Sequence, residues 1–365
     1  MSLVCVVGHS VTHHMFISRQ GAHMTTATAT AAPAAGPRLS LRDRFGRAEQ
    51  AYFVLGITVV LCIAGALTTQ NFLTSGNFAS LLRLSAAFGI LAIGEAIVIL
   101  GKGIDLSVAG IGLGCAQATL AFISSGMPEW QAITLLTLLA LGIGVVNGVL
   151  IAYFEVPALF ATLATGMLAI GGIDILFLDQ NVYTVPGSSI IAALSHGSVF
   201  GIPRPVIIAA VVFVLAWLFI SYTSPGKLIR AMGDNFDTAR SSGAPVRPLQ
   251  VLTYVIAALL AVLAGFVTAS IQGSVQTTVT SFDPILFTAL TVAVIGGVSL
   301  SGGRGSILGV LAGSLFVGVL NNLLVLHGLS SAVQDLIRGA VLIAAIAFDA
   351  WLHPRNEETA KSGEL

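Results

Sequence analysis

The feature that most constrains this chain is a series of long apolar runs, most of them close to twenty residues, separated by short polar segments. Only 9% of the 365 residues are charged, whereas a soluble domain has about 25%. A helix needs about twenty apolar residues to cross a bilayer, and lipid does not tolerate unpaired backbone. The runs are continuous and lack the period of two that barrel strands show. The sequence therefore predicts an all-α, polytopic membrane protein.

We expect about ten membrane-spanning helices and three regions of chain. Residues 1–37 are expected to form a disordered tail or extension, with Met24 as an alternative to Met1 as the native start. Residues 38–352 form the transmembrane domain, and residues 353–365 form a cytoplasmic tail. The spans are predicted at Ala51–Thr69, Leu84–Gly101, Leu106–Ser124, Gln131–Phe154, Pro157–Leu178, Pro205–Tyr222, Leu249–Gln272, Ile285–Leu300, Ile307–His327 and Ala332–Leu352.

The segment Asn71–Leu82, between the first two spans, mixes polar and apolar residues, so we expect it to lie in the membrane interface or to re-enter the membrane. Forty glycines suggest close helix packing, because small residues four apart let helix backbones approach. That spacing occurs at Gly110/Gly114, Gly144/Gly148 and Gly305/Gly309/Gly313.

The distribution of Lys and Arg predicts the orientation. With the N-terminus in the cytoplasm, thirteen of the sixteen Lys and Arg residues fall on the cytoplasmic side. Only Arg83, Arg204 and Arg338 are left near the outer side. This bias follows the positive-inside rule and supports an even number of spans with both termini in the cytoplasm.

The longest polar stretch between two spans is Thr223–Gln250, on the predicted cytoplasmic side. Asp234 or Asn235 can cap a short helix that begins near Asp237 and ends at Gly243. Pro245 and Pro248 are expected to close the loop before the next span. A short capped helix parallel to the membrane suits docking into a groove of another protein, and the alternative is a solvated connector.

Four segments carry a resemblance to a known family. Gly233–Gly243 resembles the cytoplasmic coupling loop of ribose-type carbohydrate ABC permeases, with matches at Gly233, Asn235, Ala239, Ser242 and Gly243 and departures at Thr238 and Ala244. Three further segments are similar to motifs of that family in the family's order: Gly103–Val108 (GIDLSV), Val156–Met167 (VPALFATLATGM) and Ile295–Gly309 (IGGVSLSGGRGSILG). Further departures, at Ala109-Gly110, Ala164 and Gly171-Gly172, bear on pathway detail and leave the family resemblance intact.

The resemblance implies a permease subunit of a bacterial ABC importer in the inner membrane. It implies three protein partners: a second permease copy, a separate ATPase that docks on the coupling loop, and a periplasmic sugar-binding protein. The residues that it assigns to the coupling loop are Arg230, Gly233, Asn235, Ala239, Arg240, Ser242 and Gly243. It assigns Asp105, Ser107, Thr162 and Thr165 to motif positions on the possible pathway, to which we add Glu95, and it places Gly303, Arg304 and Gly305 in a cytoplasmic turn.

The sequence argues against other kinds of site. Neither Gly-Lys pair has the spacing of a phosphate-binding loop, so no cofactor is expected and ATP would be bound by the partner. Gly302–Ser306 is better explained as a tight turn than as a nucleotide loop. The three scattered cysteines and seven histidines give no metal pattern, and zero net charge gives no reason to expect nucleic acid.

Besides a receptor-like or structural membrane protein, two rival functions remain open at this point. One is a branched-chain amino-acid ABC permease, against which the GIDLSV-like segment favours sugar. The other is an ion-coupled secondary carrier, because Glu95 falls in the middle of a span, where a charge is costly and often functional. Asp174 also falls within a span, while Asp335 and Arg338, three residues apart, are expected to pair on one helix face.

Overall fold

The computed structural model describes residues 47–177, 182–276 and 279–352, and the side chains of residues 50–176, 182–276 and 285–350. All of these residues belong to one compact unit, Leu41–Leu365. The predicted tails, 1–37 and 353–365, lie outside the described residues. The long helices of the described part are α2 Arg47–Thr68, α3 Ser75–Leu100, α4 Val108–Ser124, α5 Glu129–Ala152, α6 Ala158–Phe177, α8 Arg204–Tyr222, α11 Val246–Gln272, α12 Val279–Ile295, α13 Ile307–Leu326 and α14 Ser331–Leu352.

These helices confirm the predicted all-α, polytopic membrane protein. Eight of them are long and apolar enough to cross a membrane by length and composition. The other two, α4 and α12, have 17 residues each, which is the lower limit for a crossing. Each of the ten predicted spans overlaps one of these helices.

Helices α3, α4 and α11 form the centre of the bundle. Most of the apolar window of α3 is buried, whereas almost none of that of α14 is. Helix α11 packs on α3, α4 and α5, and glycines make these contacts close. A Cβ atom on Gly265 of α11 would collide with the backbone oxygen of Gly112 on α4. The predicted pair Gly144/Gly148 faces α11 in the same way, where Cβ atoms would lie 2.9 and 2.5 Å from Ala258 Cβ and Val251 Cα.

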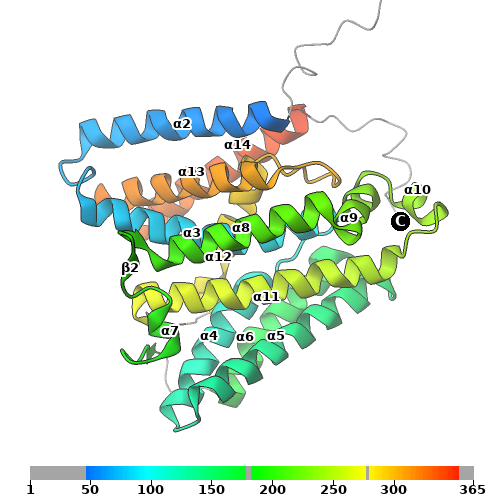
Figure 1. Ribbon diagram of the computed structural model, residues 1–365, viewed down its shortest axis with the longest axis horizontal. Coiled ribbons are helices and arrows are strands. Elements are labelled where there is room, and N and C mark those ends of the chain that lie inside the picture. The colour runs from blue at the N-terminus through cyan, green and yellow to red at the C-terminus, as the bar shows by residue number, and fades with distance from the viewer. Residues whose placement is uncertain (1–46, 178–181, 277–278, 353–365) are drawn as a thin grey trace, which may run out of the picture. The chain divides into compact units, whose positions relative to one another are not determined.

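Short elements occupy the two ends of the bundle (Figure 1). One end carries α9 Ser224–Asp234 and α10 Phe236–Ser241. The opposite end carries α7 Ile190–Ala193 and two antiparallel strand pairs. Strand β1 Tyr183–Thr184 pairs with β4 Ser274–Val275, and β2 Ser198–Val199 pairs with β3 Ile202–Pro203. The coupling-like loop and the long loop before α8 therefore lie at opposite ends, as the predicted topology requires.

Most of the segment Asn71–Leu82 belongs to α3, which begins at Ser75, so it is not a separate re-entrant element. Its expected position in the membrane interface stays a prediction. The side chain of Thr74 caps the helix by accepting the backbone N–H of Asn77 at 3.3 Å. Asn77 also exchanges two hydrogen bonds with Asn322 of α13, at 3.0 and 2.7 Å. The polar residues thus serve capping and helix pairing.

The eighth span is shifted toward the N-terminus relative to the predicted Ile285–Leu300. Helix α12 runs from Val279 to Ile295, and Gly297 follows it with a φ of +83°, a left-handed conformation that ends helices. Gly305 likewise lies in the turn before α13, so it does not belong to the helix-packing series with Gly309 and Gly313. The end of α12 was misplaced because apolarity continues past the point where glycine ends the helix. Gly305 matched the series by spacing alone, although it precedes the first residue of α13.

The seventh span begins earlier than predicted, because α11 starts at Val246 and includes Pro248 in its first turn. Proline is tolerated there, since the first turn of a helix does not need its N–H groups for internal hydrogen bonds. Pro248 therefore does not close the preceding loop, and only Pro245 stays outside the helix, at its N-cap.

Candidate functional site

The coupling-like loop folds as a helical knuckle made of α9 and α10. Thr223 caps α9 by accepting the backbone N–H of Gly226 at 3.2 Å. The side chain of Asn235 caps α10 by accepting the backbone N–H of Thr238 at 2.9 Å. Gly243, with a φ of +81°, follows α10 and turns the chain toward α11. The predicted short helix is confirmed, with Asn235 as its cap and its first residue one position earlier, at Phe236.

The end of α9, in the middle of the knuckle, packs against two turns that are far away in the sequence. A Cβ atom on Gly233 would collide with the carbonyl oxygen of Leu100 and would lie 2.5 Å from the nitrogen of Gly303. The backbone N–H of Gly303 donates to the Leu100 oxygen at 3.0 Å. Arg304 lies 3.8 Å from the carboxylate of Asp234, in an exposed ion pair that contributes little to stability. The ends of α3, α9 and the α12–α13 turn thus form one tight backbone junction.

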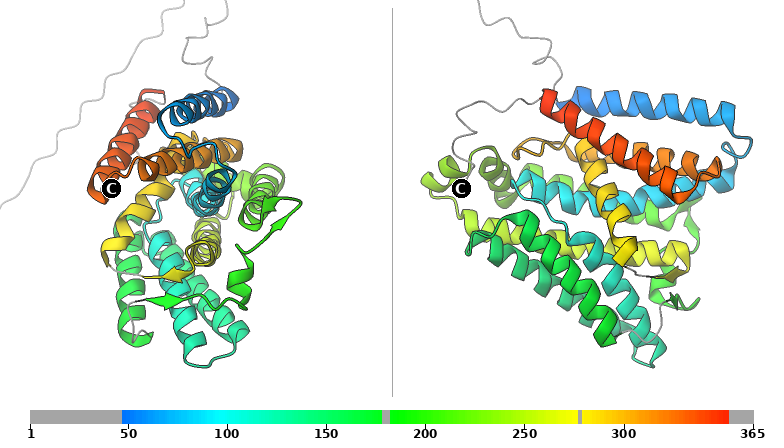
Figure 2. Two further views of the ribbon diagram at one scale, coloured as in Figure 1. Left: turned by 90° about the vertical axis from the view of Figure 1, so that its left-hand side faces the viewer. Right: turned by 180° about the vertical axis from the view of Figure 1, so that it is seen from behind.

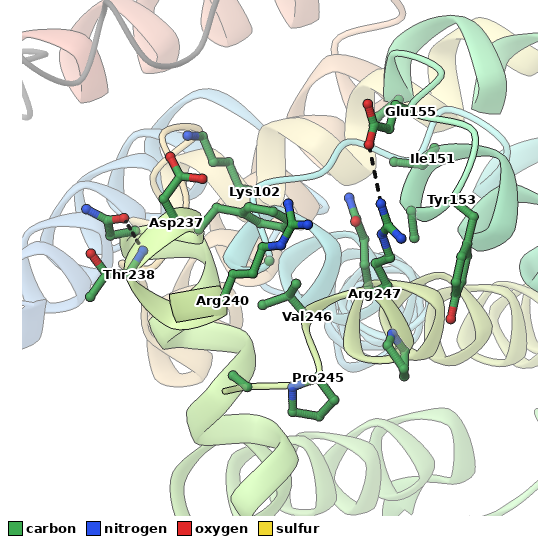
Figure 3. A pocket seen from close by; sticks show the side chains of 18 of the residues that line it. Lys102, Ile151, Tyr153, Glu155, Asp237, Thr238, Arg240, Pro245, Val246 and Arg247 are labelled. Atoms are coloured by element: carbon green, nitrogen blue, oxygen red, sulfur yellow. Dashed lines mark hydrogen bonds and ion pairs between the residues drawn. The ribbon is translucent and has the colours of Figure 1, made fainter. Parts of the chain in front are cut away.

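Beside α10 the surface has a hollow with a volume of about 790 Å³. The hollow lies between α10, the loop from α5 to α6, and the start of α11 (Figure 3). Figure 3 shows Arg240 extending into it from α10, and it shows Arg247 of α11 paired with Glu155 at 3.5 Å. Lys102 and Asp237 also line it, so its charge is mixed. A hollow of this size with both signs of charge can receive a polar segment of another protein.

The predicted coupling residues divide into two groups. Arg240, Ser242, Gly243 and Asn235 are exposed, and Arg240 and Asn235 line the hollow. The others are turned inward: Gly233 and Ala239 are buried, and Arg230 is partly buried. The exposed group is available for contact with a partner, while the buried group holds the knuckle against the bundle.

A second group of predicted residues forms a buried polar network that begins in the loop following α3. In the loop between α3 and α4, one carboxylate oxygen of Asp105 accepts hydrogen bonds from the backbone N–H and the hydroxyl of Ser107. The side-chain amide of Asn147, on α5, donates to the Ser107 hydroxyl at 2.8 Å and accepts from Thr165 of α6 at 2.6 Å. The Thr162 hydroxyl accepts the backbone N–H of Leu106 at 3.0 Å. The GIDLSV-like loop is thereby tied to α5 and α6.

The carboxylate of Glu95 faces this network from α3. Glu95 and Asp105 are both almost completely buried, and one Glu95 oxygen accepts the backbone N–H of Asp105 at 3.4 Å. Among the described residues, the second oxygen of each carboxylate has no hydrogen-bond partner. The hydroxyl of Tyr254, from α11, lies close enough to interact electrostatically with both carboxylates. Burial raises the pKa of Asp105, which lies outside both helices, to about 6, and hydrogen bonds from Ser107 oppose the rise.

Sequence reasoning missed Asn147 and Tyr254. Asn147 joins Ser107 to Thr165, and it lies between Gly144 and Gly148 in an otherwise apolar run. One polar side chain inside a glycine-rich span was an available signal. Tyr254 gave none, because its place beside two carboxylates depends on how α11 crosses α3.

The remaining polar residues of the spans lie elsewhere. The predicted pair of Asp335 and Arg338 is confirmed at 2.8 Å, and Arg338 also donates to Asn321 of α13 at 2.7 Å. Asp174 is exposed on α6. Asp349 of α14 accepts from Ser299 at 3.3 Å, near the α12–α13 turn. The bonds of Arg338 to Asn321 and of Ser299 to Asp349 connect separate elements, and all of these residues are separate from the Glu95–Asp105 network.

The comparisons with known proteins decide the family. A family model described as "Branched-chain amino acid transport system / permease component" matches residues 77–346, which include the knuckle, the junction and the buried network. The chain belongs to this permease family. The permease motifs recognised in the sequence therefore lie within a match that covers most of the spanning helices.

Individual relatives agree with the ribose-type resemblance. The permease is 37% identical over 297 residues to the ribose import permease protein of Bacillus subtilis (strain 168), covering 81% of this chain and 91% of that protein. It is 34% identical to the ribose import permease protein of Escherichia coli (strain K12), covering 81% and 92%. It is 32% identical to the L-arabinose transport system permease protein of the same strain, covering 84% and 92%. No solved structure matches the permease.

Proposed function

We propose that this permease is the membrane-spanning subunit of an ATP-binding-cassette importer for a small sugar in the inner membrane of a bacterium. The observation that carries the proposal is the similarity, over nearly their whole length, to permeases named for ribose and L-arabinose. The family description names amino-acid transport. The sugar permeases, however, match over a stretch of 297 residues, which is long enough to include the GIDLSV-like loop. A monosaccharide or a related polyol is therefore the proposed cargo.

The energy for import comes, in this proposal, from a separate ATPase. Neither Gly101-Lys102 nor Gly226-Lys227 has the Ser or Thr and the earlier glycine that a phosphate-binding loop needs. The ATPase docks at α10 and the adjoining hollow, where Arg240 and Asn235 are exposed. A periplasmic binding protein delivers the sugar to the opposite end, and two permease copies enclose the path.

The junction supplies a mechanism of coupling. A displacement of α10 is passed through Gly233 to Leu100 at the end of α3 and to Gly303 before α13, because these backbones are in direct contact. Helix α3 is largely buried, so it cannot shift without moving its neighbours α11 and α13. Packed interfaces of this kind change in discrete rigid-body steps, which suits alternating access.

The test is uptake in proteoliposomes that contain the permease, its ATPase and its binding protein. Arg240→Ala should lower sugar uptake and weaken co-purification of the ATPase, while the permease still inserts. Lys227→Ala is the matched control, because Lys227 is an exposed cation of α9 that does not line the hollow. Equal uptake by the two variants would remove the assigned docking role.

The same vesicles decide the cargo and the energy source. Ribose, arabinose and leucine are offered separately, with and without ATP. Uptake of leucine in place of sugar would indicate an amino-acid permease. Uptake driven by an ion gradient without ATP would indicate a secondary carrier.

A further inference from the structure

The hairpin before α8 has an unusual turn. Strands β2 and β3 pair Val199 with Ile202, which leaves Phe200 and Gly201 as a two-residue loop. Their φ angles are +53° and +80°, so both central residues are left-handed. Two left-handed central residues define a type I′ turn, in which Asn-Gly is the favoured sequence.

Phenylalanine is a costly choice at this position. Bulky side chains rarely adopt positive φ, whereas asparagine does so readily. Packing inside the described part of the protein does not offset this conformational strain, because Phe200 is completely exposed (101%). A strained residue that makes no internal contact is a reason to look for an external one.

The neighbours of Phe200 make the tip apolar as a whole. Val199 and Ile202 are 43% and 47% exposed, so three large apolar side chains surround a turn that contains no charge. An exposed apolar group of this kind marks contact with a membrane or a protein. The location of the hairpin distinguishes between these two.

The hairpin continues the outward surface of a spanning helix. Strand β3 leads directly into α8 at Arg204, and α8 exposes an apolar face that includes Val211, Val214 and Leu215. Figure 2 (left), which looks along the helices, shows the hairpin at the edge of the bundle beyond α8. This apolar face of α8 is suited to contact with lipid, and the hairpin lies at its end.

We propose that the tip Val199–Ile202 is an interfacial anchor that inserts into the boundary between headgroups and acyl chains of the outer leaflet. Apolar and aromatic side chains at this depth gain burial without crossing the membrane. Arg204 is exposed at the first position of α8 and donates to the Ala193 oxygen at 2.9 Å, which fixes a cation at headgroup level next to the tip. The anchor does not depend on which solute the permease carries.

The test uses the full chain with Cys5, Cys62 and Cys115 replaced by alanine, in liposomes of phosphatidylethanolamine and phosphatidylglycerol. A spin label is placed at Phe200→Cys, with Ser188→Cys, an exposed position before α7, as the control. Collision rates with oxygen and with a water-soluble nickel chelate are compared. The oxygen-to-nickel ratio should be several-fold higher at position 200 than at position 188. Equal ratios would overturn the anchor.

A second measurement keeps the native cysteines. Wild-type permease in the same liposomes, with a photoactivatable phospholipid added, should be cross-linked in the peptide that contains Val199–Ile202. Phe200→Asn preserves the turn, because Asn-Gly suits it, and should lower that yield several-fold. An unchanged yield would contradict the proposal. In the spin-label experiment, a label at position 200 that is shielded from the nickel chelate only when a soluble binding protein is added would assign the tip to a protein partner. That result would also overturn the proposal.

Discussion

The backbone N–H of Gly303 donates a hydrogen bond of 3.0 Å to the carbonyl oxygen of Leu100. This bond joins two similar sequence turns, Gly101-Lys102-Gly103 and Gly303-Arg304-Gly305, which are two hundred residues apart in the chain. Gly233 lies against both partners of the bond. The proposed coupling loop is therefore connected directly to two separate parts of the bundle, and this connection motivates the first prediction.

Gly233→Ala should weaken the junction. The new Cβ atom would meet the Leu100 oxygen and the Gly303 nitrogen, which are backbone atoms that cannot turn away. Overpacking of this kind costs about 1–3 kcal/mol in the free energy of unfolding. Thermal melting in detergent should show lower stability, and ATP-driven uptake should fall. Gly76→Ala is the control, because nothing lies within 4 Å of its Cβ position and alanine suits a helix, so it should lower neither stability nor uptake.

Asn235→Ala should loosen α10. The side chain of Asn235 accepts the backbone N–H of Thr238, and loss of a helix cap costs about 1 kcal/mol. Asn235→Asp keeps a capping oxygen and should restore the helix. Amide hydrogen exchange across Phe236–Ser241 measures the effect, with faster exchange in the alanine variant only. Equal protection in both variants would show that the cap is not needed.

Glu95→Gln should stabilise the permease and leave ATP-driven uptake intact. One Glu95 oxygen has no hydrogen-bond partner among the described residues, and an unpaired buried charge costs several kcal/mol. Glutamine removes the charge and can still accept the backbone N–H of Asp105. We expect a gain of about 1–3 kcal/mol in unfolding free energy. Loss of uptake by a stable variant would instead favour an ion-coupled carrier.

The pH dependence of stability should contain a contribution from Asp105. Its pKa of about 6 in the folded protein lies above the ordinary value of 3.8, so the folded state holds this proton more tightly. The stabilisation is fully present below the ordinary value and is lost as the pH rises through about 6, with a magnitude of about 3 kcal/mol. Melting curves between these limits should show the loss. Asp105→Asn should flatten that part of the profile, and an unchanged profile would exclude Asp105 as the group responsible.

The site was predictable where a local pattern has one physical meaning. An asparagine followed by a short helix and a glycine predicts a cap and a terminator, and Asn235 and Gly243 take these places. The glycine pairs predicted close helix contacts, and Gly148 makes one with α11. The pattern misled where two signals compete, as at Gly297, where apolarity continues but a left-handed glycine ends the helix.

The sequence by itself determined the membrane class, the ten helices and the coupling motif. These depend on apolar runs, capping residues and glycine spacing, which act within a few residues of chain. Only the tertiary structure decided that Asn147 joins the Asp105 loop to α6, that Tyr254 faces two carboxylates, and that Gly233 lies between Leu100 and Gly303. Such neighbours come from helices far apart in the sequence, and their meeting depends on how glycine-lined helices cross.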